Sequence, residues 1–280
     1  METNEWITGE VVIGIAGEPV KMHLTVPAGP VKPQRMLPVF HKITNTFIEM
    51  VSAASDARGS AVTCQKGCAA CCRQPIPLTE IEVYHIAELV KSMPEPLRTE
   101  IDHRFTQAAE HFESLGWFER LRKVDQLRAT GQRALALEEL KTVAIDYLNE
   151  WVDCPFLEDE SCMIHADRPL SCREYLVTSP PPNCWQPTPD NISRVSLAVF
   201  PSSIVSDLAA TGALRGSILL IQALEFAERN PESFPVKTGE RWTADFFGRL
   251  TDQEIPETSV PGTAETRRKR PQKLRKKRQK

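Results

Sequence analysis

Four cysteines crowd one short stretch of the chain, at Cys64, Cys68, Cys71 and Cys72. A free cysteine otherwise packs as a small apolar side chain, so packing gives no reason to gather four of them. Thiolates bind zinc, iron and copper(I) well. The Cys68-x-x-Cys71 spacing lets two sulfurs reach one ion, whereas the adjacent side chains of Cys71 and Cys72 must diverge. This pattern predicts a metal site and leaves open two metals, a cluster, or one cysteine that is not a ligand.

The other four cysteines form a second group: Cys154, Cys162, Cys172 and Cys184. Residues 1–63 and 185–280 therefore contain no cysteine. Disulfides are the alternative for eight cysteines, but they need an oxidising compartment. The amino terminus is acidic and lacks the apolar run of a secretory signal. We therefore expect reduced thiols that bind metal, in a cytoplasmic protein.

The residues around the cysteines form five motifs in order: GC-x-x-CC at 67–72, CPFL at 154–157, C-x-I-H at 162–165, RPL-x-CREY at 168–175 and TSPP-x-x-C at 178–184. Together they resemble the CxxCxxCC cysteine-cluster family, also called YkgJ-like, to which zinc or iron chelation is attributed. The resemblance covers roughly residues 60–185 and implies a metal-binding domain, with little about an activity. There are two departures from the family pattern: the gap between Cys64 and Cys68 is three residues instead of two, and His165 stands where many relatives have Tyr.

Six cysteines come first as candidate ligands: Cys68, Cys71, Cys72, Cys154, Cys162 and Cys172. Cys64 and Cys184 come next. His165 has the offset of a metal knuckle from Cys162, and its alternative role is a hydrogen bond to a neighbouring loop carbonyl. Eight sulfurs suffice for two four-coordinate zinc sites, and iron–sulfur clusters also use four cysteines each. The expected cofactor is therefore zinc or iron, with an iron–sulfur cluster as one form of the latter.

Three arginines flank the cysteines: Arg73, Arg168 and Arg173. A nearby positive charge lowers the pKa of a thiol and offsets the charge of a thiolate-rich site, and this is the role that we favour for them. Their alternative role is to bind an anionic substrate. Glu174 and Tyr175 either hydrogen-bond and orient the metal ligands or contact a substrate, and the sequence does not separate these roles.

The charge of the chain is unevenly distributed. The formal net charge is −3, but residues 267–280 hold ten Lys and Arg and no acid, which leaves a net charge of −13 on the rest. An acidic body is not a nucleic-acid-binding domain by composition. Residues 251–280 are predicted to form a disordered basic tail, which either contacts nucleic acid or another anionic partner or only aids solubility. No segment is long and apolar enough for a membrane span, and no oligomeric state is indicated.

Hydrophobic periodicity predicts a mainly α (α+β) fold in three parts: an amino-terminal β-hairpin in 1–30, a helical cysteine-cluster domain in 36–250 and the tail. Helices are expected over Phe40–Arg58, Leu97–Phe112, Leu140–Trp151, Ser206–Asn230 and Trp242–Leu250. A further helix should follow the capping box at Thr79–Glu82, and a strand is expected at Ser196–Phe200. In the helix over Ser206–Asn230, Leu214, Ile218 and Ile221 should face inward. Two helix ends, near residues 59 and 152, should bring both cysteine groups to one end of the domain.

These patterns support three functional hypotheses. The first is an intracellular protein that chelates zinc or iron. The second is an iron–sulfur enzyme that modifies a macromolecule, for example by protein lysine N-methylation, since some enzymes of that kind carry a similar cysteine cluster. The third is a zinc-stabilised module that binds nucleic acid or protein. The sequence has neither a glycine-rich phosphate loop nor a G-x-S-x-G nucleophile elbow, so the first hypothesis is preferred and an enzymatic activity stays open.

Overall fold

The computed structural model describes residues 5–15, 18–65, 67–188, 190–209 and 218–251. Contacts divide the chain into two compact units, which are described separately. The hairpin unit combines Met1–Pro30 with Thr238–Lys280, and the cysteine unit comprises Val31–Lys237. The predicted basic tail lies outside the described residues, except for Thr251. Among the helices that the structure describes, none has both the length and the apolar composition to cross a bilayer.

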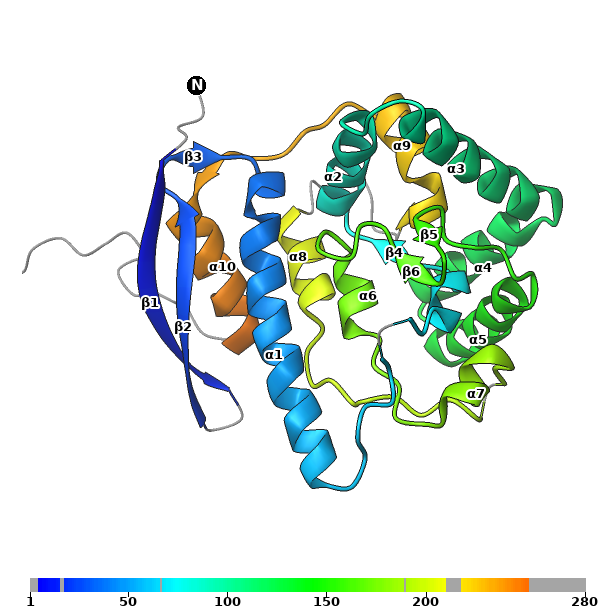
Figure 1. Ribbon diagram of the computed structural model, residues 1–280, viewed down its shortest axis with the longest axis horizontal. Coiled ribbons are helices and arrows are strands. Elements are labelled where there is room, and N and C mark those ends of the chain that lie inside the picture. Colours follow the sequence, from blue (N-terminus) through cyan, green and yellow to red (C-terminus); the bar gives the residue numbers. More distant parts are fainter. Residues whose placement is uncertain (1–4, 16–17, 66, 189, 210–217, 252–280) are drawn as a thin grey trace, which may run out of the picture. The chain divides into compact units, whose positions relative to one another are not determined.

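The hairpin unit is built from two antiparallel strands and one helix (Figure 1). Strand β1 (Trp6–Ile15) pairs with β2 (Glu18–Pro27), as the alternating pattern predicts. Helix α10 (Gly239–Thr251) lies against β2, and its Phe246 and Phe247 are fully buried. A Cβ atom at Gly239 would lie 2.4 Å from the carbonyl oxygen of Pro27, so only glycine fits there. The helix expected near the carboxyl end is confirmed, and its contacts are with the hairpin.

The cysteine unit is mainly helical, which confirms the predicted fold class. Its α-helices are α1 (Leu37–Ala57), α2 (Glu80–Lys91), α3 (Leu97–Ser114), α4 (Trp117–Ala129), α5 (Arg133–Asn149), α6 (Leu170–Glu174), α7 (Pro181–Trp185), α8 (Pro201–Ala209) and α9 (Ala223–Arg229). Three short 3₁₀ helices are η1 (Pro33–Met36), η2 (Ala70–Arg73) and η3 (Leu220–Gln222). Its two-residue strands are β4 (Pro77–Leu78), β5 (Leu157–Glu158), β6 (Ser161–Cys162) and β7 (Ile218–Leu219), and two more, β3 (Pro30–Val31) and β8 (Lys237–Thr238), span the unit boundaries in the sequence.

Local signals predict the end of helix α1 and the start of helix α2, whereas α1 begins at Leu37, three residues before the expected Phe40. Helix α1 ends at Ala57, and Gly59 follows in the left-handed conformation with φ of +80°. Helix α2 begins with the expected capping box: the Thr79 hydroxyl accepts from the Glu82 N–H, and the Glu82 carboxylate accepts from the Thr79 N–H. The chain that leaves α1 turns back toward α6 (Figure 1).

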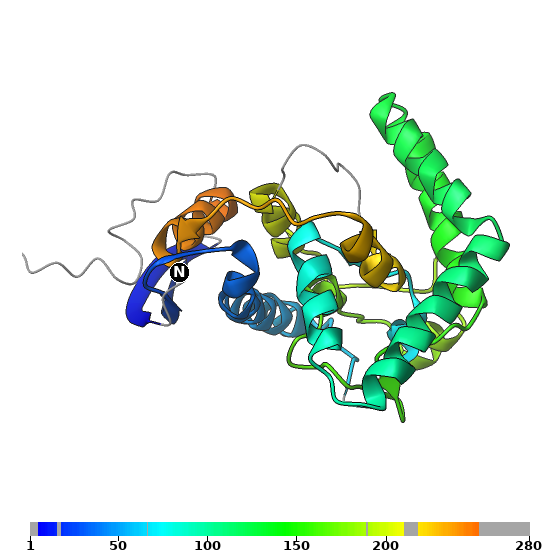
Figure 2. The same cartoon turned by 90° about the horizontal axis from the view of Figure 1, so that it is seen from above.

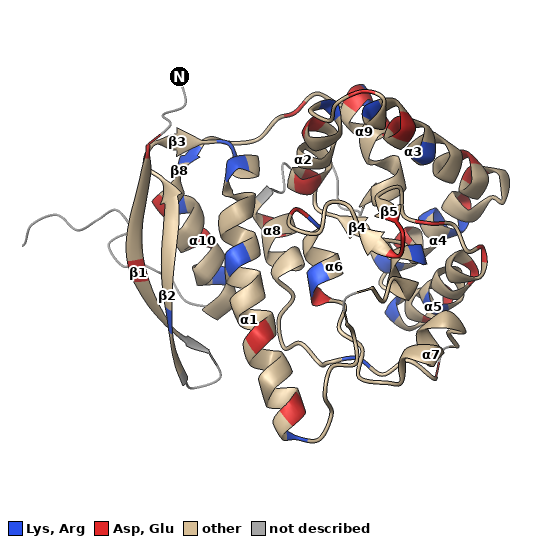
Figure 3. Ribbon diagram, in the orientation of Figure 1, with Lys and Arg blue, Asp and Glu red and all other residues tan. Residues whose placement is uncertain are grey.

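Helices α3, α4 and α5 share an aromatic core. The rings of Phe112 and Tyr147 stack with centroids 3.9 Å apart, and the indole N–H of Trp117 donates to the carbonyl oxygen of Val143 at 2.9 Å. Helices α4 and α5 pack side by side and extend away from the other helices of this unit (Figure 2). Acidic and basic residues are interspersed along α3, α4 and α5 (Figure 3).

Two expectations for the carboxyl-terminal half of this unit are wrong. The segment expected as one helix over Ser206–Asn230 contains α8, β7, η3 and α9, and its residues 210–217, including Leu214, lie outside the described residues. Strand β7 pairs with β4 in antiparallel register, with Leu78 opposite Ile218. Residues 196–200 form no strand and instead lead into α8. In both places long-range packing, which a local pattern cannot show, decides the backbone conformation.

Candidate metal centre

All eight cysteines line one cavity of about 670 Å³. Each is a free thiol. The two groups are far apart in sequence, so the fold brings them together, as the positions of the helix ends predict. Apolar side chains complete the wall, among them Ile76, Phe156 and Ile164. His165, Arg168 and Tyr175 also line the cavity.

The loop that carries the first group is pinned to the segment before the last cysteine. The N–H of Thr63 donates to the carbonyl oxygen of Val177 at 2.8 Å, and its hydroxyl donates to that of Ser179 at 2.7 Å. The Cys64 sulfur accepts a hydrogen bond from the Val177 N–H at 3.3 Å. Gly67 takes a φ of +83°, which favours glycine, just before Cys68. These contacts hold the first cysteines beside the strand-like segment at 177–179.

The second group joins the first through the backbone. The N–H of Cys154 donates to the carbonyl oxygen of Cys72 at 2.8 Å. Strands β5 and β6 then form a tight hairpin in which Leu157 pairs with Cys162. Its two turn residues, Asp159 and Glu160, both have positive φ angles, of 48° and 52°. The turn therefore reverses the chain direction within two residues, and Cys162 lines the same cavity as Cys154.

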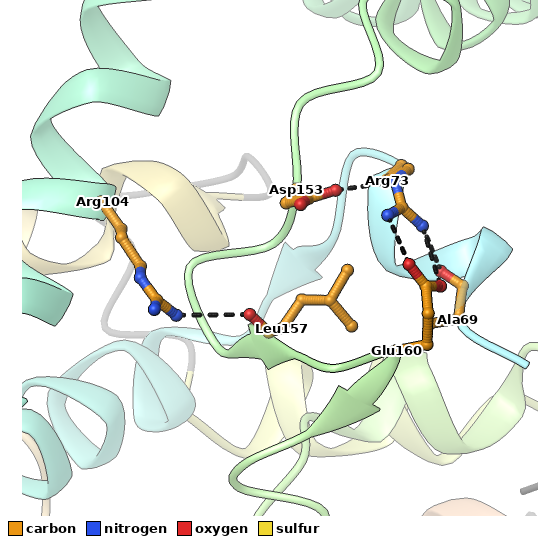
Figure 4. Close-up of polar contacts among 6 residues, drawn as sticks. All are labelled: Ala69, Arg73, Arg104, Asp153, Leu157 and Glu160. Atoms are coloured by element: carbon orange, nitrogen blue, oxygen red, sulfur yellow. Dashed lines mark hydrogen bonds and ion pairs between the residues drawn. The ribbon is translucent and has the colours of Figure 1, made fainter. Parts of the chain in front are cut away.

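A set of five side chains, which we call the Arg73 clasp, ties these loops together. Its members are Arg73, Asp153, Glu160, Trp151 and Trp185. The guanidinium pairs with Asp153 at 2.7 Å and with Glu160 at 2.8 Å (Figure 4). It also lies 5.6 Å and 5.4 Å from the ring centroids of Trp151 and Trp185, whose rings stack at 5.8 Å. The clasp thus connects η2, the segment after α5, the β5–β6 turn and α7.

The expectation that helix α5 extends to Trp151 is wrong. Helix α5 ends at Asn149, and Trp151 has a φ of 53° and a 47% exposed side chain. Such a φ is strained for a bulky residue, and it turns the indole toward Trp185. Arg104 of α3 supports the same region by donating to the carbonyl oxygen of Leu157 at 3.2 Å (Figure 4).

The loop that carries Cys172 is anchored by buried charged side chains. Glu82, 2% exposed, accepts from the Leu170 N–H at 2.7 Å in addition to its capping bonds at α2. Arg173, 4% exposed, donates to the carbonyl oxygens of Arg168 and Ala166 and to the Asn45 side chain. One carboxylate therefore caps both α2 and α6, and Arg173 holds the backbone that precedes α6.

Glu174 also has a structural role. Its carboxylate accepts from the N–H and the hydroxyl of Ser202, both at 2.6 Å, at the start of α8. Burial raises the pKa of this carboxyl to about 7. Tyr175 lies on the cavity wall, with the Arg194 guanidinium 5.3 Å from its ring centroid. Of this neighbouring pair, only Tyr175 therefore lines the cavity.

The three flanking arginines have different surroundings. Arg73 pairs with two carboxylates, and Arg173 is engaged by two carbonyls and an amide. Arg168 lines the cavity, and its buried Nε has no hydrogen-bond partner among the residues that the structure describes. The pKa values of Cys162 and Cys71 are raised overall, and burial contributes to both rises. The positive charge of Arg168 opposes this rise in part. Charge compensation, expected for all three arginines, is therefore best supported for Arg168.

The thiols disfavour one another's ionisation. Burial, with help from the negative charges of Cys162 and Asp153, raises the pKa of the Cys154 thiol to about 12. Burial and the same kind of repulsion, from Cys154 and Cys71, raise the pKa of Cys172 well above its ordinary value. These thiols are therefore protonated at neutral pH unless a cation binds. A soft cation reverses this preference, because a coordinating thiol is deprotonated outright.

The donor set fits a soft metal, although the sulfurs are not yet in a closed arrangement. Among the residues that the structure describes, no three Cys, His, Asp or Glu side chains already stand where they could hold one ion. Eight sulfurs on one cavity wall are nevertheless the donors that zinc and iron–sulfur sites use. Zinc–sulfur bonds are about 2.3 Å long, so the sulfurs must draw together around an ion.

The comparisons with known proteins agree with this chemistry. Residues 63–189 match the CxxCxxCC family, described as a "Putative zinc- or iron-chelating domain". No curated protein and no solved structure matches the chain. The matched segment contains all eight cysteines. Residues 63–189 therefore match a cysteine-cluster domain to which metal chelation is attributed, and this domain occupies part of a longer chain.

Three features of the site have weak sequence signals or none. The capping box marks Glu82, and the CREY motif marks Arg173. No local pattern shows that both side chains hydrogen-bond the backbone around the start of α6. The Arg73 clasp combines residues from four segments. Their only common signal is the closeness of Arg73, Asp153 and Trp185 to cysteines in the sequence.

Proposed function

We propose that the domain at 63–189 binds zinc or iron through its cysteine thiolates. The ligands are Cys64, Cys68, Cys71, Cys72, Cys154, Cys162, Cys172 and Cys184. The observation that carries this proposal is the convergence of all eight on one cavity. Packing alone does not require this convergence, because a buried cysteine in an apolar core needs no second thiol beside it.

The chain's own residues have distinct roles in this proposal. The cysteines lose their protons to bind the ion, and the Arg73 clasp and Glu82 hold the loops that carry them. Arg168 offsets part of the negative charge that the thiolates acquire. When bound, the metal supplies the positive charge that makes adjacent thiolates stable. Reduced thiols suit a cytoplasmic protein, which is where we place it.

One observation favours a second function, that of an iron–sulfur enzyme acting on a macromolecule such as a protein lysine. The cavity of about 670 Å³ lies in the size range of small-ligand pockets, roughly 300–1,000 Å³. Tyr175 and His165 lie on its wall beside the thiols. An enzyme needs such room for a reacting group, whereas a purely structural zinc site is closed by its four ligands. The contact of the basic tail with nucleic acid stays a prediction.

The test is metal analysis with a visible spectrum on protein purified without oxygen. We expect about stoichiometric zinc or iron, and the Cys71→Ser and Cys172→Ser variants should each lose metal. The matched control is Ala108→Ser, which adds a hydroxyl to a buried site in α3, away from the cavity lining. Iron with acid-labile sulfide supports the enzyme, and zinc on a colourless protein supports the chelator. Full metal occupancy in both cysteine variants would contradict the ligand assignment.

A further inference from the structure

The eight thiols do not share one environment. Cys154, Cys162 and Cys172 pack against an apolar cluster that includes Phe156 and Ile164. We call these three the deep set. They come from the loop after α5, strand β6 and helix α6.

The outer set is Cys64, Cys68 and Cys184. Cys64 is exposed, and its sulfur accepts from the backbone N–H of Val177. Cys184 lies on α7, which contacts η2. The loop that carries Cys64 and Cys68 is held to the segment just before α7, because the hydroxyl of Thr63 donates to the carbonyl oxygen of Ser179. The three outer cysteines thus come from neighbouring segments.

The remaining cysteines, Cys71 and Cys72, lie between the two sets. Both are on η2. The carbonyl oxygen of Cys72 accepts a hydrogen bond from the N–H of Cys154 in the deep set, and η2 also contacts α7, which carries Cys184 of the outer set. The two cysteines are adjacent, and adjacent side chains diverge from a shared backbone. The pair can therefore contribute one sulfur to each set.

Four sulfurs complete the tetrahedral coordination of one zinc ion, and an ion has no room for eight. We infer that the cavity holds two separate metal sites, a deep site with Cys154, Cys162 and Cys172 and an outer site with Cys64, Cys68 and Cys184, and that the adjacent Cys71 and Cys72 complete them with one sulfur each. This inference rests on the proposed metal binding. It adds the number of ions per chain and states which cysteines bind each ion. The deep site is fixed by Glu82 and Arg173 through α6. The outer site has the exposed thiol, so its ion should exchange more readily.

The experiment counts zinc ions. Protein purified without oxygen is stripped with a chelator, reconstituted with zinc alone and freed of excess metal, and its zinc content is measured. We expect two ions per chain in the wild type, and one in Cys184→Ser and in Cys162→Ser. The ion left in Cys184→Ser should transfer to a competing chelator at least tenfold more slowly than the ion left in Cys162→Ser. Ala108→Ser should keep two ions, and circular dichroism reports whether each variant is folded.

The outcomes separate this inference from the proposed function. A wild type with no zinc overturns the metal-binding proposal itself. A wild type with one zinc leaves metal binding intact and overturns the two-site division. Loss of both ions from each folded single variant shows one coupled centre and also overturns it. Cys64→Ser serves as a second outer variant if Cys184→Ser does not fold, and it should likewise retain one ion.

Discussion

The Arg73 clasp should hold the cysteine loops together before any metal binds. The perturbation that tests this is Arg73→Met, which keeps the length of the side chain and removes its charge and hydrogen bonds. The arginine side chain is 12% exposed, whereas its partners Asp153 and Glu160 are 57% and 45% exposed. Methionine can still contact Trp151 and Trp185, so apolar contact is largely preserved.

The magnitude follows from these exposures. An ion pair with a solvent-exposed partner contributes about 0.2–1 kcal/mol, and the clasp has two of them. A cation–π contact at a partly exposed site adds about 0.5–1 kcal/mol. We therefore expect Arg73→Met to lower the free energy of unfolding of the metal-free protein by about 1–3 kcal/mol. Because a loosened loop must be reordered around the ion, zinc affinity should fall roughly tenfold, which corresponds to about 1.4 kcal/mol.

The assay is urea unfolding of the metal-free protein in a double-mutant cycle with Glu160→Gln. We expect the two changes to be non-additive by about 0.5–1 kcal/mol, because each removes the same ion pair. Glu158→Gln is the matched control, since Glu158 is an exposed carboxylate on the same β-hairpin. Additive effects of Arg73→Met and Glu160→Gln, or equal stability of Arg73→Met and wild type, would refute the role of the clasp.

Three further predictions concern charge, pH and the tail. Arg168→Met should weaken zinc binding about 10–100-fold in a chelator competition, and Arg168→Lys should restore most of it because it keeps the charge; equal affinity of Arg168→Met and wild type would exclude charge compensation. The raised pKa values of Cys154, about 12, and Cys172 mean that the metal-free fold favours the neutral thiols. Their contribution to stability is full below the unfolded pKa of about 8.5 and is lost as the pH rises toward the folded values, by roughly 1 kcal/mol per thiol and pH unit. Urea midpoints of the metal-free protein should therefore fall between about pH 8 and 10, and a flat profile would contradict this. Removal of residues 267–280 should leave the zinc content unchanged, and a loss of zinc would show that the tail supports the site.

Elements with a strong local pattern were predictable from the sequence. The β1–β2 hairpin follows from alternation of apolar residues, and α1 follows from its apolar stripe and the glycine at position 59. The capping box at Thr79 and Glu82 marks the start of α2 because both groups act within one turn. The cysteine motifs similarly identify the metal chemistry, since the thiol itself is the functional group.

Elements that depend on distant partners were not predictable. Ile218 lies in an apolar run that suits a helix, but it pairs with β4, whose residues lie far away in the sequence. Trp151 fits the stripe of α5, yet the chain leaves the helix before it, and the indole stacks on Trp185. Periodicity reports only neighbours along the chain, whereas these positions are decided by contacts between segments.

The same division applies to the site. The sequence alone determined that this protein carries eight thiols in two groups, because residue type and spacing are sufficient for that inference. Only the tertiary structure decided that both groups line one cavity, and that Arg168 faces the thiols while Arg73 and Arg173 bind carboxylates and carbonyls. The physical reason is that the charge of a side chain follows from its residue type alone. Which group it contacts depends on how loops that are distant in the sequence pack against one another.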